Sequence, residues 1–191
     1  MDYKDLNARD CLQWYAVWTR SRQEKTAAAM LEALNISNFL PLISEKRQWS
    51  DRKKMVTVPA FPGYLFVQIA ATSDLELRVR EVPGVVNFVR NQLGPSAIPE
   101  HEIQNLRTLL SRAPNCLPYP FLKAGDKVRI VRGTLTGVEG SFIRNGARSR
   151  VVISVDIIQR SIAVEVSTDD VEPAENSTQR EPYLAFAQSS A

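Results

Sequence analysis

Few residues of this chain have the chemistry of a catalytic or metal-binding group. Its 191 residues include one histidine, His101, and two cysteines, Cys11 and Cys116. A single histidine excludes zinc sites built on paired histidines, and no CxxC pair is present. We interpret the two cysteines as free thiols in a reducing compartment, with a disulfide between them as the alternative. His101 stands between Glu100 and Glu102 near an expected helix start, which favours a surface histidine over a general base.

Motifs of the common enzyme classes are absent from the sequence. It has no GxSxG, no P-loop and no GxGxxG, and its carboxylates show no distinctive pairing. We therefore expect no enzyme activity, no metal and no cofactor. No apolar run approaches the ~20 residues of a membrane span, and the first ten residues are polar. These features predict a cytoplasmic protein without a membrane partner.

The basic residues are concentrated in one short segment. The net charge is only +3, but residues 46–54 hold five basic residues and one acidic residue. Such a loop, which we expect at the tip of a hairpin, suits contact with nucleic-acid phosphates through counterion release, and Trp49 within it suits stacking on a base. A solvated hairpin with a half-buried tryptophan explains the pattern equally well. The candidate phosphate-binding residues here are Lys46, Arg47, Arg52, Lys53 and Lys54.

A second basic cluster lies where a strand at 14–19 is expected to turn into a helix. It consists of Arg20, Arg22 and Lys25. A helix N-terminus with added cations can hold a phosphate, and simple solvation of the three side chains is the alternative. With the loop 46–54, these residues form the candidate nucleic-acid-binding set.

Hydrophobic periodicity predicts alternating strands and helices before residue 113. Strands are expected at 14–19, 39–43, 55–58, 64–69 and 85–89. Helices are expected to begin at two S-x-x-E capping boxes, 21–24 and 73–76, and at Pro99. The first helix should run to about Asn35 and pack through Ala27, Met30, Leu31 and Leu34. This order favours helices packed on a largely antiparallel sheet.

Strand alternation predicts an aromatic face on that sheet. If the aliphatic residues of 64–69 face the helices, Tyr64 and Phe66 face the other way, and Trp14 and Trp18 share one face of the first strand. Aromatic side chains on an open sheet face would form a protein-binding patch. Cover by loops or by a neighbouring domain is the alternative.

Residues after a proline-rich linker are typical of a small β-barrel. Strands rich in β-branched residues alternate with glycine turns at 127–131, 141–144, 150–155 and 162–166. Because β-branched residues disfavour helix, we expect a constitutive barrel. The expected organisation is a flexible N-terminus at 1–11, an α+β domain at 12–112, a linker at 113–122, an all-β domain at 123–172 and a disordered tail at 173–191.

Four segments resemble NusG-type transcription elongation factors. WYAV at 14–17, FPGYLFV at 61–67 and VPGVVNFV at 82–89 are similar to the N-terminal domain of that family, and GDKVRI at 125–130 is similar to its KOW domain. The resemblance covers residues 12–172 and implies an α+β NusG-type domain followed by an SH3-like KOW barrel. A KOW segment alone is less specific, because ribosomal proteins also carry it.

The resemblance implies a monomeric bacterial elongation or antitermination factor that suppresses pausing by clamping RNA polymerase, with no bond made or broken. It assigns Trp18, Tyr64 and Phe66 to the coiled-coil clamp helices of the largest polymerase subunit. Arg20 matches a position that faces non-template DNA in the paralogue RfaH, and the loop 46–54 would point toward upstream duplex.

In the same family the KOW surface binds NusE, a ribosomal small-subunit protein, and in housekeeping NusG also Rho. The resemblance assigns Ile157 and Ile158 to this surface. Burial in the barrel core is the alternative for these isoleucines.

The branch of the family is indicated by two further segments. Residues 38–41 and 84–90 look nearer to specialised paralogues such as RfaH and the antiterminators of long operons. RfaH reads its DNA element with a patch of residues that this chain does not share. The matching positions here are Met30, Ala33, Leu34 and Pro83. We therefore do not expect the RfaH element to be recognised. Residues 75–78 also depart from the RfaH contact to the second polymerase subunit. Housekeeping NusG with Rho coupling and a ribosome-associated KOW protein are the alternatives.

Overall fold

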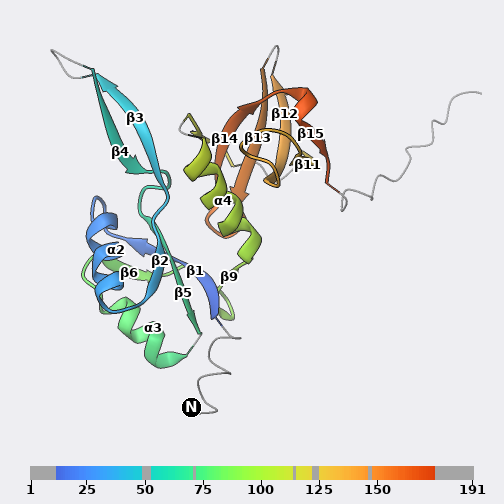
Figure 1. The fold of residues 1–191 in the computed structure, drawn as a ribbon. Coiled ribbons are helices and arrows are strands. Elements are labelled where there is room, and N and C mark those ends of the chain that lie inside the picture. The colour runs from blue at the N-terminus through green and yellow to red at the C-terminus, as the bar shows by residue number, and fades with distance from the viewer. Residues whose placement is uncertain are drawn as a thin grey trace, which may run out of the picture.

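The computed structural model describes residues 12–48, 53–70, 72–113, 115–121, 125–145 and 148–174. Its described part contains an N-terminal α+β region and a C-terminal β-region of residues 115–174 (Figure 1). Helix α4 (Glu100–Arg112) lies between the two. The predicted fold class, an α+β unit followed by an all-β unit, is confirmed.

The N-terminal sheet is antiparallel, as predicted. Its strand order is β2-β5-β1-β6, and β9 also pairs with β1. The central strands β1 and β5 run side by side, with Tyr15 opposite Val67 and Trp18 opposite Tyr64. The five strands are β1 (Leu12–Thr19), β2 (Ser37–Phe39), β5 (Tyr64–Ala70), β6 (Val85–Phe88) and β9 (Ala97–Ile98).

The two faces of this sheet have different covers. Helices α2 (Glu24–Ala33) and α3 (Ser73–Arg80) pack on one face through buried aliphatic residues. The opposite face, which carries the aromatic residues, packs toward α4. The alternation predicted from the sequence is therefore confirmed, because side chains of successive strand residues point to opposite faces.

Both predicted capping boxes are wrong. Helix α2 has Gln23 as its N-cap, with no side-chain hydrogen bond, because a left-handed residue at Arg22 (φ 63°) turns the chain before the helix begins. Helix α3 is capped one residue earlier than predicted, by the Thr72 hydroxyl, which accepts from the Leu75 N–H at 3.5 Å. An S-x-x-E pattern gives the approximate start of a helix but not its cap.

The predicted packing stripe of the first helix is half wrong. Ala27 and Leu31 are buried, but Met30 and Leu34 are exposed. The helix ends at Ala33, and a short helix resting on a sheet buries one narrow line of residues spaced four apart. Met30 and Leu34 therefore border a groove of about 390 Å³ between α2 and the end of α3.

The basic segment lies at the end of a hairpin, as predicted. Strands β3 (Leu42–Gln48) and β4 (Lys53–Pro59) pair from Leu42–Pro59 to Gln48–Lys53 and project from the N-terminal region (Figure 1). The strand predicted at 39–43 is interrupted, because β2 ends at Phe39 and β3 begins at Leu42. Residues 49–52, with Trp49 and Arg52, lie outside the described residues.

Two more short strands, β7 (Arg90–Asn91) and β8 (Gly94–Pro95), pair with each other outside the N-terminal sheet.

The C-terminal β-region is one antiparallel sheet of order β10-β14-β13-β12-β11-β15. Its β-branched residues, such as Val151, Ile153 and Ile162, are buried as predicted. The predicted linker is partly wrong, because its residues 117–119 form β10 on β14. A proline such as Pro118 is tolerated there, since β10 is an edge strand. The strands are β10 (Leu117–Tyr119), β11 (Asp126–Ile130), β12 (Glu139–Asn145), β13 (Arg148–Val155), β14 (Arg160–Val166) and β15 (Val171–Pro173), with short 3-10 turns η1 (Asp156–Ile158) and η2 (Thr168–Asp170).

Candidate functional site

The aromatic face of the N-terminal sheet brings together the three residues expected to bind a protein partner. Trp18 on β1 is directly opposite Tyr64 on β5, and their ring centroids are 4.6 Å apart. Phe66 lies two residues further along β5, opposite Ala16. Pairing across adjacent antiparallel strands thus places all three on one face.

The sequence left open whether this face is exposed or covered, and its centre is covered. Phe66 is 0% exposed and Tyr64 is 5% exposed, whereas Trp18 is 45% exposed. Phe66 packs between Phe39 and Phe61, at centroid distances of 6.2 and 6.3 Å. Only the rim of the predicted patch, at Trp18, is free for a partner.

An arginine of α4 forms part of the cover. The Arg107 guanidinium lies 4.7 Å from the centre of the Trp14 ring and 5.1 Å from that of Phe39. Cation–π contacts of this kind hold the helix on the aromatic face. Arg107 was not predicted from the sequence; the available indication was a charged residue within the apolar stripe of Leu106, Leu109 and Leu110.

The C-terminal β-region reaches the same neighbourhood. Burial raises the pKa of the Tyr64 hydroxyl, and the Arg160 guanidinium at the start of β14 acts in the opposite direction. A cleft of about 690 Å³ is lined there by residues of both regions. Arg22 and Lys25 of the second basic cluster line this cleft together with Tyr119 and Arg160.

Two residues of the second basic cluster donate hydrogen bonds to backbone carbonyls of neighbouring segments. The Arg20 N–H donates to the Gly84 carbonyl at 2.8 Å, and the Lys25 ammonium donates to the Thr57 carbonyl at 2.9 Å. Gly84 has φ 95°, and a Cβ there would lie 3.0 to 3.1 Å from the Gln23 side chain. A glycine is therefore required where the VPGV segment passes the turn. Arg20 and Arg22 are exposed, so they are available to a phosphate.

A buried carboxylate holds the FPGY loop in place. Glu24 is buried, and its Oε1 accepts a hydrogen bond from the Gly63 N–H at 2.9 Å. Gly63 has φ 82°, which a glycine adopts without strain. This contact positions the start of β5 and hence Tyr64. From the sequence, Glu24 was expected only as part of a capping box.

Glu24→Gln should destabilise the fold by about 1–3 kcal/mol, because the Gly63 N–H loses a charged acceptor in a buried place. Urea unfolding of the full chain measures this. Glu32→Gln on the exposed side of the same helix is the matched control and should change stability by less than about 0.5 kcal/mol. Equal stability of the two variants would show that the Glu24 contact contributes nothing.

The two isoleucines assigned to the KOW surface differ in exposure. Ile158 is buried in the core, which is the alternative left open by the sequence. Ile157 is half-buried and packs against that core, so part of its side chain remains accessible. Both belong to η1, between β13 and β14.

Among the described residues, those with catalytic or metal-binding chemistry include His101 and Cys116. His101 is exposed, and no group of three metal-ligating side chains occurs in the described part of the chain. Cys116 is buried as a free thiol, and burial raises its pKa, whereas Cys11 lies outside the described residues. Within the described ranges, no helix is long and apolar enough to cross a membrane.

A family model, curated relatives and solved structures are similar to this chain. The family model described as "Transcription termination factor nusG" matches residues 12–107. The transcription termination/antitermination protein NusG of Thermus thermophilus is 29% identical over 179 residues, covering 84% of this chain and 97% of the relative. That of Staphylococcus aureus is 28% identical over 173 residues, covering 84% and 94%. The solved structure "Domain interaction in Thermotoga maritima NusG" has a TM-score of 0.48 at 23% identity, covering 86% of this chain and 98% of that one.

Proposed function

The chain belongs to the NusG family of transcription termination/antitermination factors, and we propose that it binds transcribing RNA polymerase and suppresses pausing in the cytoplasm. The observation that carries this proposal is the family match over residues 12–107, the region whose aromatic face ends in the exposed Trp18. The relatives are transcription factors and not enzymes, in keeping with the lack of catalytic motifs in the sequence.

The proposed contact is with the coiled-coil clamp helices of the largest polymerase subunit. Trp18 offers a large, half-exposed ring that lies against the Tyr64 ring at an angle of 37°, which suits the apolar stripe of a coiled coil. Phe66 lies beneath and would act as a positioning residue rather than as a contact. The exposed Arg20 and the basic hairpin would then hold non-template or upstream DNA.

Trp18→Ala should weaken polymerase binding by at least about 2 kcal/mol, because large aromatic side chains dominate such interfaces. Pull-down of core RNA polymerase by the tagged full chain, titrated to give a Kd, measures this. Trp18 is already half-exposed, so the fold should tolerate the change.

Leu77→Ala is the control for that experiment. Leu77 is 47% exposed, close to the value for Trp18, but lies on α3, on the opposite face of the sheet. Its variant should bind polymerase like the unaltered chain. If the Leu77 variant loses polymerase binding and the Trp18 variant keeps it, the interface lies on the α3 face instead.

For the C-terminal β-region we propose recruitment of NusE, with the accessible part of Ile157 as a contact and Ile158 as its support. Rho is the alternative partner. Ile157→Ala should weaken capture of NusE by the full chain, and unchanged capture would place the contact elsewhere.

Two branches of the family remain as candidates for the biological role. Segments 38–41 and 84–90 favour a specialised paralogue that acts on long operons. The relatives described as termination/antitermination proteins favour housekeeping NusG coupled to Rho. Capture of Rho by the chain would select the housekeeping role, and a neighbouring polysaccharide gene cluster would select the specialised one. The family match in the first half disfavours a ribosome-associated KOW protein.

A further inference from the structure

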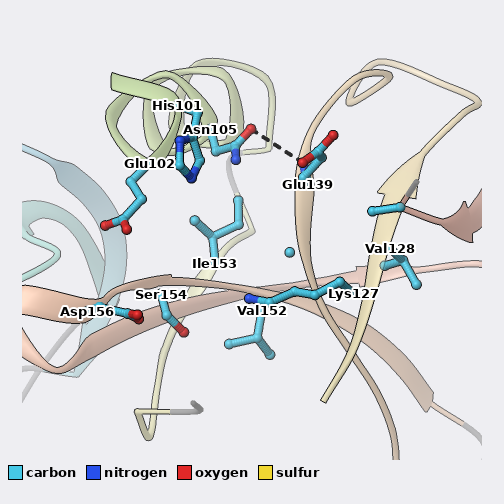
Figure 2. Close-up of a pocket in the computed structure, with 12 residues that line it drawn as sticks. His101, Glu102, Asn105, Lys127, Val128, Glu139, Val152, Ile153, Ser154 and Asp156 are labelled. Carbon is cyan, nitrogen blue, oxygen red and sulfur yellow. Dashed lines mark hydrogen bonds between the residues drawn. The ribbon is translucent and has the colours of Figure 1, made fainter. Parts of the chain in front are cut away.

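Helix α4 packs on the C-terminal β-region through buried apolar residues and through polar contacts at its surface. Asn105 Oδ1 accepts from the Glu139 N–H at 3.3 Å, and the Arg112 guanidinium donates to the Thr134 carbonyl at 3.0 Å. A cavity of about 300 Å³ remains between the helix and strands β11, β12 and β13 (Figure 2). The interface therefore combines buried apolar contacts with an open cavity that charged side chains line.

One carboxyl group of α4 is partly buried in this interface, and one of its two oxygens has no hydrogen-bond partner among the described residues. Figure 2 shows Glu102 extending from α4 on the side where Asp156 lies. Glu102 Oε2 is buried and accepts no hydrogen bond from any described residue. Burial, and after it the Asp156 carboxylate, raises the pKa of Glu102 to about 7, against the lowering effects of the Asp156 backbone N–H and Lys127.

The charged groups around this carboxyl come from every element packed on it. On α4 itself, His101 lines the same cavity. From the β-region, Lys127 on β11, Glu139 on β12 and Asp156 on η1 line it. Glu139 is engaged by the Arg129 guanidinium at 2.6 Å. Burial of the carboxyl has the largest effect on its pKa, ahead of the opposing charges of Asp156 and Lys127.

We propose that the docking of α4 on the C-terminal β-region is a proton-controlled latch, closed when the Glu102 carboxyl is neutral and weakened when it ionises between Asp156 and the apolar wall of the barrel. The latch goes beyond the proposed function, and its test contains no polymerase. The two proposals can therefore fail separately.

The direction of the pH dependence follows from proton linkage. In the undocked chain the carboxyl is hydrated and titrates near its ordinary value of 4.5, whereas in the docked chain its pKa is about 7. Between pH 4.5 and pH 7, Glu102 is therefore more often protonated in the docked chain than in the undocked chain. Docking is strongest below pH 4.5 and weakens as the pH rises through 7. Allowing for solvent screening, the docking equilibrium should change about tenfold between pH 5.5 and pH 7.5.

Fluorescence energy transfer in the full chain tests the latch. Dyes are placed on cysteines introduced at Leu77 on α3 and at Arg144 on β12, both exposed, with Cys11 replaced by serine and the buried Cys116 left in place. Transfer should fall as the pH rises from 5.5 to 7.5. In Glu102→Gln, transfer should stay high and independent of pH.

Two further variants make the test specific. Glu100→Gln changes an exposed carboxylate of the same helix, one that accepts from Gln104 at 2.6 Å, and it should titrate like the unaltered chain. Asp156→Asn removes the repelling charge and should shift the midpoint to lower pH. Circular dichroism verifies that each variant is folded.

A pH-independent signal in the unaltered chain would overturn the proposal. So would a Glu102→Gln variant that titrates like the unaltered chain, or low transfer at every pH, which would show that the two regions do not dock in the free chain.

Discussion

Phe66→Ala is expected to lower the free energy of unfolding by about 3–5 kcal/mol, the usual cost of removing a phenyl ring from a packed core. Phe66 is completely buried at the centre of β5, in contact with the rings of Phe39 and Phe61. Its loss would leave a cavity under α4 that these neighbours cannot fill. Urea unfolding followed by circular dichroism measures the change.

The size of this effect affects how binding experiments are designed. A Phe66 variant that loses polymerase would report unfolding as much as a lost contact, whereas the half-exposed Trp18 does not have this difficulty. Leu93→Ala is the matched control for stability, because Leu93 is almost fully exposed in the turn between β7 and β8. A Phe66 variant as stable as the Leu93 variant would contradict the packing described for the aromatic face.

Neutralising the hairpin should have the largest effect on nucleic-acid affinity. The variant replaces five cations by glutamine: Lys46, Arg47, Arg52, Lys53 and Lys54. Each lost phosphate contact should reduce the slope of log affinity against log salt by about 0.9, and affinity at low salt should fall about tenfold or more. Binding to a reconstituted elongation complex over a salt series measures both quantities.

The control removes three exposed cations outside the hairpin, by Arg80→Gln, Arg132→Gln and Arg144→Gln. Its salt slope should stay near that of the unaltered chain. If the control and the hairpin variant lose the same affinity per charge, the hairpin contributes only its net charge and no specific contact with DNA.

The local pattern predicted the strands and their faces well. Alternation in β1 and β5 placed Trp18, Tyr64 and Phe66 on one face, because the two-residue period of a strand is set by its backbone geometry alone. The hairpin of β3 and β4 and the β-branched strands of the C-terminal region were predicted for the same local reason.

The cover of that face could not be predicted from local pattern. Arg107 meets Trp14 across more than 90 residues, and Arg160 approaches Tyr64 from another region. Contacts between such distant segments depend on the tertiary arrangement, which periodicity does not encode. Glu24 was misassigned for a related reason, since its partner Gly63 lies on a different loop.

The central claim is that the chain meets RNA polymerase through the end of the aromatic face at Trp18. Site-specific photo-crosslinking tests it most directly, with a photoreactive residue placed at position 18 or, in a separate variant, at position 77, two sites of similar exposure on opposite faces. Position 18 should crosslink to the largest polymerase subunit within its clamp helices, and position 77 should not. A crosslink to those helices from position 77 and none from position 18 would contradict the account.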